Sequence, residues 1–387
     1  YFSAFWSQLN LERETFLDLA HNTQPWGDTF SLVVLAMRMS GRRNGVSELH
    51  GNVARKMWSH LWPDIPVSEV PILHITNGVH TRSWIAPGVQ DLFDKYLEPN
   101  WMEHLDDFDA WEGIDNIPDK EFWEVRAQLK RKLVAYIHDL ARQKRIPGND
   151  YQARVITSSL QLDPNVLTIG FARRFTTYKR SNLILRDPER LLELINKPGR
   201  PVQVIFAGKA HPADEPGQRL IQEVHRQVKR TANNGRLVFL EEYDINLARY
   251  LIQGVDVWLN TPRRPNEASG TSGQKAAING VLNFSVLDGW WYEGFNGSNG
   301  WAIGENRDYE DEEAEDAADA ESLYQTLERE IVPLYYSRSI DELPVEWLAR
   351  VKQSVMTLAP RFSMTRMSKE YVSKMYLPAF LESDPHK

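Results

Sequence analysis

A loop of small residues that ends in a lysine is the stretch of this sequence best suited to chemistry. It runs Asn-Glu-Ala-Ser-Gly-Thr-Ser-Gly-Gln-Lys over residues 266–275 and leads into a predicted helix. Backbone N–H groups at a helix N-terminus, with glycines that allow close approach, can bind an anion. Lys275 could hold a phosphate there or, if its pKa is depressed, form a Schiff base with an aldehyde cofactor. Taken alone, so short a motif favours the simpler alternative, an ordinary loop-to-helix junction with a solvated lysine.

The elements that would position this loop follow from an alternation of apolar and amphipathic segments. The predicted strands cover residues 166–171, 202–207, 236–240, 255–259 and 282–287. Helices are predicted over about 180–196 and 215–233. Near-continuous apolar strands separated by helices are typical of a parallel, doubly wound α/β sheet.

Cations gather where the predicted strands end. The segment after the first strand holds four within eight residues, and others follow the second and fourth strands: Arg173, Arg174, Lys179, Arg180, Lys209, Arg263 and Arg264. Because the carboxyl ends of parallel strands meet at one edge of a sheet, these loops and the Lys275 loop should converge on one crevice. Cations gathered beside a helix N-terminus predict a phosphate pocket. A solvated basic patch is the less favoured alternative, because the chain is acidic and its cations cluster at strand ends.

The first part of the chain has a different pattern. Residues 1–62 are predicted to be helical, with a buried helix over 30–39 and another over 47–58. His50 is assigned a structural hydrogen-bonding role, because nothing near it completes a catalytic pair. A short strand over 72–75 then leads into polar and small residues, where open α/β sheets bind ligands.

Three further segments are predicted to be helical. Residues 90–146 are long and charged, and three tryptophans should anchor their packing: Trp101, Trp111 and Trp123. Residues 304–330 are acidic and are assigned to a solvated loop and helix start, not to a metal site. Residues 363–376 predict an amphipathic helix that ends at Pro378.

Composition limits the class of protein. At 387 residues the chain suggests two domains, and 42% hydrophobic and 25% charged residues are usual for a soluble globular protein. The net charge of −8 argues against a nucleic-acid partner. The absence of cysteine excludes disulfides and thiolate chemistry. The sequence contains no apolar run long enough to predict a membrane span. A cytoplasmic protein is therefore expected. The first residue is Tyr1 and not methionine, which suggests a fragment or a processed chain.

These motifs resemble the α-glucan phosphorylases, the family of glycogen, starch and maltodextrin phosphorylases, in its shorter bacterial and archaeal branch. The similarity covers nearly the whole chain and rests on five motifs in the family's order. They are Asn77-Gly78 to Arg82-Ser83-Trp84, Arg173-Arg174 to Tyr178-Lys179-Arg180, Gly208-Lys209-Ala210, Leu240-Glu241-Glu242-Tyr243, and Glu267 to Lys275 continued by Asn279-Gly280 and Leu287-Asp288-Gly289.

The resemblance implies a GT-B architecture, in which two Rossmann-like domains face each other and the C-terminal one binds pyridoxal 5'-phosphate. Residues 1–77 would end the N-terminal glucan-binding domain, 78–362 would form the cofactor domain, and 363–387 would be a helix that crosses back. Most of the N-terminal domain would then lie outside this chain. No metal is implied, and a homo-oligomer is one open possibility because the family is usually oligomeric.

The resemblance also implies a role for each motif residue. The catalytic set would be Arg174, Lys179 and Lys275, with Lys275 carrying the cofactor as a Schiff base. The cofactor-binding residues would be Lys275, Tyr243, Trp84, Arg173, Thr271 and Ser272. Sugar hydroxyls would be bound by Glu267, Ser269, Gly270 and Asn77, and orthophosphate by Arg174 and Lys179.

The implied reaction is attack of orthophosphate on the non-reducing end of an α-1,4-glucan or maltodextrin. It would give α-glucose 1-phosphate with retained configuration, with the cofactor's phosphate as the proton relay. Two phosphate groups held close together need dense cationic compensation, which the clustered cations would supply.

Two departures from the family's pattern are notable. Gln274 stands where the family usually has methionine. Asp244 follows Tyr243 where animal members carry an arginine near the cofactor's phosphate, for which Arg263 or Arg264 could compensate.

Two other functions stay open from the sequence. A glycosyltransferase that uses nucleotide sugars, such as a glycogen synthase, would need similar cations but no Schiff-base lysine. A non-catalytic glucan-binding module would make use of the 13 tryptophans. The chain taken by itself is expected to be inactive.

Overall fold

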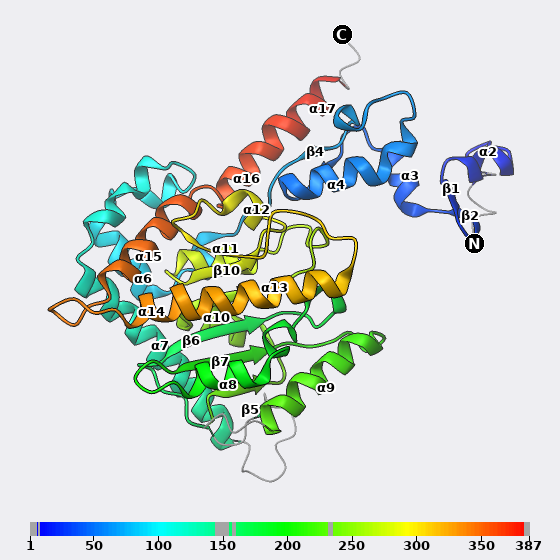
Figure 1. Ribbon diagram of the computed structural model, residues 1–387. Coiled ribbons are helices and arrows are strands. Elements are labelled where there is room, and N and C mark those ends of the chain that lie inside the picture. The colour runs from blue at the N-terminus through cyan, green and yellow to red at the C-terminus, as the bar shows by residue number, and fades with distance from the viewer. Residues whose placement is uncertain (1–5, 7, 144–154, 157–159, 231–234, 383–387) are drawn as a thin grey trace. The chain divides into compact units, whose positions relative to one another are not determined.

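The computed structural model describes residues 6, 8–143, 155–156, 160–230 and 235–382 (Figure 1). The chain forms two compact units. Unit 1 comprises residues 1–45, 51–75 and 370–387, and unit 2 comprises residues 46–50 and 76–369. Every residue predicted to form the site belongs to unit 2.

Unit 2 is built on a seven-stranded sheet with the strand order β11-β10-β9-β6-β7-β8-β5. The strands are β5 (Val155–Ile156), β6 (Leu167–Ala172), β7 (Val202–Ala207), β8 (Leu237–Leu240), β9 (Val257–Asn260), β10 (Leu282–Val286) and β11 (Gly300–Ile303). All neighbours pair in parallel except β5, which runs antiparallel to β8. The predicted α/β class, a doubly wound, Rossmann-like sheet of GT-B type, is confirmed. Strands β5 and β11 were not predicted.

Helices cover both faces of this sheet. The helices of unit 2 are α5 (Thr81–Trp84), α6 (Pro87–Tyr96), α7 (Asp119–Gln143), α8 (Pro188–Asn196), α9 (Glu215–Arg230), α10 (Ile245–Gly254), α11 (Ser272–Ile278), α12 (Trp291–Gly294), α13 (Glu312–Thr326), α14 (Val332–Tyr336), α15 (Val345–Leu358) and α16 (Met364–Tyr371). The last of these, α16, continues into unit 1. Short segments of 3₁₀-helix are η3 (Trp101–Glu103), η4 (Asp109–Asn116), η5 (Thr177–Lys179) and η6 (Leu183–Leu185), and η7 (Leu327–Ile331) is a π-helical segment.

Strand β7 shows how the two faces are filled. Val204 and Phe206 belong to the apolar cluster that contains residues of α8 and α9. The alternate residues, Ile205 and Ala207, belong to a second cluster with residues of α7 and α10. All six residues of β7 are buried, as expected for a strand covered on both faces.

The sheet reverses its strand order between β6 and β9. From β6 the chain moves through β7 to β8 on one side, and it then returns to place β9 and β10 on the other side of β6. The loops that leave β6 and β9 therefore diverge, and open α/β sheets bind ligands in the crevice that such a divergence leaves.

The helix predicted from about residue 180 begins later, at Pro188. Arg180 has a left-handed backbone with φ of 42°, which interrupts a right-handed helix, and the chain forms the turns η5 and η6 instead. The helix start is set by Asp187, whose side chain accepts a hydrogen bond from the Arg190 N–H, and by Pro188 in the first turn.

The tryptophans of the 90–146 segment do anchor its packing. Trp101 and Trp111 are buried, with ring centroids 5.3 Å apart, and Phe93 of α6 packs edge-on against both. Trp123 of α7 is half-buried and contacts Tyr335 of α14. Residues 144–146 lie outside the described residues, as do residues 231–233 of the helix predicted over 215–233.

Unit 1 corrects the prediction of a helical N-terminal segment. Its elements are α2 (Arg13–Asp18), β1 (His21–Gln24), β2 (Gly27–Phe30), α3 (Leu32–Met39), β3 (Asn44–Gly45), α4 (Glu48–Trp58, which begins in unit 2), η1 (Ser59–Leu61), η2 (Val67–Glu69), β4 (Leu73–His74), η8 (Val372–Tyr376) and α17 (Leu377–Glu382). Strands β1 and β2 form an antiparallel hairpin within the predicted helical region. Helix α3 was predicted to be buried, but Leu32 is 65% exposed and Met39 is 68% exposed.

The structure also corrects the predictions of a solvated acidic segment at 304–330 and of a C-terminal helix that ends at Pro378. Glu315 and Asp319 of α13 are 4% and 3% exposed, so the acidic segment is not simply solvated. The C-terminal helix continues through Pro378 to Glu382. Pro378 is the second residue of α17 and directly follows the π-helical segment η8, which interrupts the regular α-helical hydrogen bonding.

No helix in the described parts of the chain combines the length and the apolarity that a membrane span requires.

Candidate active site

The candidate site lies where the loops after β6 and β9 leave neighbouring strands at the reversal of the sheet. The loop after β6 brings Arg173 and Lys179, and the loop after β9 brings Glu267. Arg173 Nη2 lies 2.5 Å from Glu267 Oε2, and Lys179 Nζ lies 2.9 Å from the same oxygen. The predicted convergence of these two loops is therefore present in the structure.

Glu267 is the anionic centre of this group. Burial alone would raise the pKa of its carboxyl, but Arg173 and Lys179 outweigh burial and hold the pKa below its usual value. Glu267 is therefore ionised at neutral pH. Because two cations pair with one carboxylate, the group of three side chains keeps an excess of positive charge.

Burial and neighbouring charge change the protonation of Lys179. Burial, assisted by the charge of Arg173, lowers the pKa of Lys179 to about 8, while Glu267 opposes the shift. At pH 7 Lys179 is mostly an ammonium group, but it can lose its proton within a moderate pH range. An anion bound beside it would stabilise the protonated form.

Asp288 holds the Glu267 loop in place by a hydrogen bond to its backbone. Its Oδ2 accepts a hydrogen bond of 2.8 Å from the Glu267 N–H, and its Oδ1 accepts one of 2.8 Å from the Gly289 N–H. Gly289 has φ of +52°, and a Cβ there would lie 2.4 Å from the Ser269 carbonyl oxygen. The Leu-Asp-Gly motif thus needs both its aspartate and its glycine to hold the loop, a role that the sequence did not reveal.

Asp288 should make stability depend on pH. Burial raises the pKa of its carboxyl to about 7, while the two backbone N–H groups oppose the shift. A carboxyl with a raised pKa in the folded state contributes stability that is fully present below its unfolded pKa and is lost as pH rises through about 7. We therefore expect the free energy of unfolding of the parent, minus that of Asp288→Asn, to fall between pH 5 and pH 8 in urea titrations. A constant difference would contradict this assignment.

Lys275 lies in the last turn of the short helix α11. Its Nζ is 4.0 Å from the centroid of the Trp84 ring, and its side chain is half-buried. Burial lowers the pKa of Lys275, and no carboxylate among the described residues pairs with it. A lysine whose ammonium form is disfavoured in this way is suited to nucleophilic attack on a carbonyl carbon.

Asn279 ties Lys275 and Trp84 together. Its Nδ2 donates to the Trp84 and Lys275 carbonyl oxygens, at 2.9 Å each, and its Oδ1 accepts from the Ala86 N–H at 2.7 Å. Gln274, the departure from the family's pattern, donates to the Asn77 carbonyl oxygen at 3.0 Å. The segment around Asn77 and Trp84 is therefore held against α11.

Tyr243 and Trp84 pack against one apolar cluster, which includes Ala172 of β6 and Ala276 of α11. Burial raises the pKa of Tyr243 to about 12, and the nearby charge of Arg173 opposes this shift. An added Cβ at Gly270 would lie 3.5 Å from Arg173 Nη2, so the glycine is close to the Glu267 group. These contacts connect the Glu267 group with the Lys275 region.

The other predicted site residues differ in their surroundings. Arg174 is exposed, and its side chain hydrogen-bonds with Tyr178 and does not join Glu267. Ser272 accepts a hydrogen bond from Trp258 Nε1 at 3.1 Å, and Thr271 precedes it as the N-cap of α11.

Arg263 and Arg264 were suggested to replace the arginine that animal members carry where this chain has Asp244, but both pair with other residues. Asp244 caps α10 by accepting a hydrogen bond from the Leu247 N–H. Arg263 pairs with Glu315 and Arg264 with Asp308, so both guanidinium groups are engaged elsewhere.

Orphaned buried atoms show what the site could accept. Arg173 Nη1 and Ser269 Oγ are buried and have no hydrogen-bond partner in the described part of the chain. A buried donor without a partner is costly, and phosphate or sugar oxygens would satisfy both. The residues present therefore fit a phosphorylated cofactor and an anionic or hydroxylated substrate.

Comparison with known proteins identifies a family and several relatives. A sequence model of the family described as carbohydrate phosphorylase matches residues 10–293. The chain is 43% identical over 369 residues to the maltodextrin phosphorylase of Thermococcus litoralis, covering 95% of this chain and 43% of that protein. It is 44% identical over 360 residues to the glycogen phosphorylase of Aquifex aeolicus, covering 93% of this chain and 51% of that protein.

A third relative is the glycogen phosphorylase of Mycobacterium tuberculosis, 41% identical over 350 residues, 90% of this chain and 40% of that protein. The chain belongs to the carbohydrate phosphorylase family. It spans about half the length, or less, of the relatives that it matches.

Proposed function

We propose that the protein containing this chain is an α-1,4-glucan phosphorylase, a transferase that uses pyridoxal 5'-phosphate. It would release α-glucose 1-phosphate from the non-reducing end of glycogen or maltodextrin, with retained configuration at the anomeric carbon. The observation that carries the proposal is the sharing of the Glu267 carboxylate by Arg173 and Lys179, at the sheet reversal. The family membership supports the same function.

Lys275 would hold the cofactor covalently through its amine. Trp84 and Tyr243 would flank its ring, and Arg173 with the backbone at Thr271 and Ser272 would bind its phosphate. When bound, the cofactor supplies a phosphate group that exchanges a proton with the substrate orthophosphate.

The remaining residues would bind the substrates. Lys179 would hold orthophosphate with its ammonium form, assisted by Arg174. Glu267, Ser269, Gly270 and Asn77 would bind sugar hydroxyls. In this arrangement Glu267 also holds Arg173 and Lys179 in place before the anion arrives.

The proposal is tested with the full-length protein, loaded with pyridoxal 5'-phosphate. Maltoheptaose and orthophosphate should yield glucose 1-phosphate, and the yield should depend on the added cofactor. Transfer of glucose from a nucleotide sugar without phosphorolysis would instead support a glycosyltransferase. Glucan binding with neither reaction would support a binding module. The present chain alone should be inactive, because it is expected to lack the opposing part of the site.

Orthophosphate binding should depend on the charge of Lys179. Because its pKa lies at about 8, the ammonium fraction falls by up to about tenfold between pH 7 and pH 9. We expect the affinity of the full-length protein for inorganic phosphate to fall over this range, measured by calorimetric titration. Lys179→Arg, which stays charged, should reduce the fall. Parallel pH profiles for parent and variant would refute the role of Lys179.

A further inference from the structure

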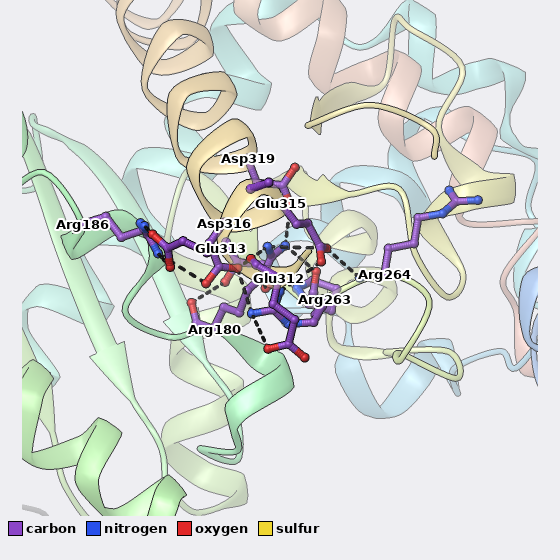
Figure 2. A network of polar contacts seen from close by, with 12 residues as sticks. Arg180, Arg186, Arg263, Arg264, Glu312, Glu313, Glu315, Asp316 and Asp319 are labelled. Atoms are coloured by element: carbon purple, nitrogen blue, oxygen red, sulfur yellow. Dashed lines mark hydrogen bonds and ion pairs between the residues drawn. The ribbon is translucent and has the colours of Figure 1, made fainter. Parts of the chain in front are cut away.

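The acidic first turns of α13 meet arginines from both loops of the candidate site. Figure 2 shows the carboxylates of this helix around Arg180 and Arg263. Arg180 directly follows Lys179 in the loop after β6, and Arg263 lies in the loop after β9, four residues before Glu267. The carboxylates of α13 therefore pair with both loops, at positions close in sequence to Lys179 and Glu267.

Arg180 is satisfied on every side of its guanidinium group. Its Nη1 lies 2.9 Å from Asp316 Oδ1, and its Nη2 lies 2.5 Å from Asp319 Oδ2. Its Nε donates to the Thr261 carbonyl oxygen at 3.0 Å, and Nη2 donates to the Pro262 carbonyl oxygen at 2.8 Å. With a side chain only 2% exposed, Arg180 joins α13 to the loop after β9.

Asp316 joins the two loops through one oxygen atom. Its Oδ1 lies 2.9 Å from Arg180 Nη1 and 2.9 Å from Arg263 Nη2. Glu315 adds a second contact, 3.1 Å from its Oε2 to Arg263 Nη1. Asp316 is the carboxylate that both loop arginines share most closely.

Backbone contacts pass this restraint on to Lys179. Thr261 Oγ1 donates to the Lys179 and Arg180 carbonyl oxygens, at 3.0 Å each. The Arg263 N–H donates to the Tyr178 carbonyl oxygen at 2.6 Å. With its backbone held on both sides, Lys179 reaches Glu267 Oε2 at 2.9 Å.

The left-handed backbone of Arg180 separates two neighbouring cations. A non-glycine residue with φ of 42° persists only where surrounding contacts over-determine it. The resulting turn sends the Lys179 ammonium to Glu267 and the Arg180 guanidinium to α13. Without the carboxylates of α13, Arg180 and Arg263 would be largely buried cations without a counter-charge, which is costly, and the two loops that carry them would lose this link.

We propose that Asp316 is a positioning residue for the candidate site. By holding Arg180 and Arg263 together, it keeps Lys179 on Glu267 and so sets how tightly the site binds a phosphate anion. The identity of that anion as substrate orthophosphate rests on the proposed function. The restraint on Lys179 does not.

The first test measures how accessible the Lys179 amine is in this chain. A short pulse of acetic anhydride, followed by peptide mapping, should label Lys179 several-fold faster in Asp316→Asn than in the parent. Glu313→Gln is the matched control, because Glu313 lies on the same helix but is 74% exposed and pairs with Arg186. Asp316→Glu, which keeps a carboxylate, should recover most of the protection.

Two outcomes would overturn the proposal. One is equal labelling of Lys179 in the parent, Asp316→Asn and Glu313→Gln. The other is a rise in Asp316→Asn that is matched at Lys130, whose side chain is 3% exposed and paired with Asp256, because this would report general unfolding.

The second test uses the full-length protein and separates the proposal from the proposed function. In Asp316→Asn the KM for orthophosphate should rise by about tenfold, the effect of weakening one charged hydrogen bond, while kcat changes much less. Glu313→Gln should match the parent. A loss of kcat at unchanged KM would contradict the positioning role. If the parent itself catalyses no phosphorolysis, the proposed function fails, and the labelling of Lys179 still decides the role of Asp316.

Discussion

Lys275→Ala in the full-length protein should reduce phosphorolysis by at least about 1,000-fold in kcat/KM, because it removes the amine proposed to hold the cofactor that carries the chemistry. The structure prepares Lys275 for this role. Its side chain is half-buried over the Trp84 ring, and burial lowers its pKa. A larger fraction of the amine is therefore neutral than in an exposed lysine. The measurement is initial-rate release of glucose 1-phosphate from maltoheptaose.

Two control variants define what this loss means. Lys275→Arg keeps a cation over Trp84 but has no amine that can bind the cofactor covalently, so it should be as inactive as the alanine variant. Lys120→Ala removes an exposed lysine of α7 and should leave the rate unchanged. Turnover retained in Lys275→Ala would refute the assignment. Turnover retained in Lys275→Arg alone would show that the residue serves only through its charge.

Glu267→Gln should have the largest effect on stability among the site variants. It leaves Arg173 and Lys179 buried without their shared carboxylate, and removal of one partner from a buried ion pair costs about 3 kcal/mol or more. We expect this loss in urea unfolding of the full-length protein, together with a large fall in phosphorolysis because the carboxylate proposed to bind sugar hydroxyls is removed.

Inorganic phosphate should reverse part of that destabilisation. An anion that binds only the folded state stabilises it, and phosphate would supply beside Arg173 and Lys179 part of the negative charge that Glu267→Gln removes. Glu305→Gln is the control, since Glu305 forms an exposed pair with Arg307 and should cost less than about 1 kcal/mol. A Glu267→Gln variant as stable as Glu305→Gln, or one that phosphate does not stabilise further, would contradict this account of the site.

The convergence of the site loops was predictable from sequence because it obeys a topological rule. Apolar runs placed β6 and β9 correctly, and parallel strands deliver their C-terminal loops to one edge of the sheet. Arg173, Lys179 and Glu267 could therefore be grouped before any coordinates were known. Their separation of about 90 residues was no obstacle to that grouping.

The supporting contacts were not predictable in the same way, because they depend on how side chains pack. Asp288 and Asn279 stood in recognised motifs, yet their bonds to Glu267, Trp84 and Lys275 are visible only in the fold. A signal was present in α13, however. Its acidic residues at 312, 315, 316 and 319 have the spacing of one helical face, which indicates a partner surface and not only a solvated segment.

The N-terminal region was predicted wrongly for a related reason. The apolar run at residues 30–39 was interpreted as a buried helix, although apolarity gives no information on which face is covered. The helix α3 exists, but Leu32 and Val33 are exposed. The hairpin before it contains Gly27 with φ of 123°, a backbone that favours glycine at a turn.

The most direct test of the central claim is covalent mapping of the cofactor. The full-length protein would be loaded with pyridoxal 5'-phosphate, reduced with borohydride, digested and analysed by mass spectrometry. The account predicts one pyridoxyl group per chain on the peptide that contains Lys275, with labelling much weaker when pyridoxal without its phosphate is used. A label on another lysine, or no label in the intact protein, would contradict it.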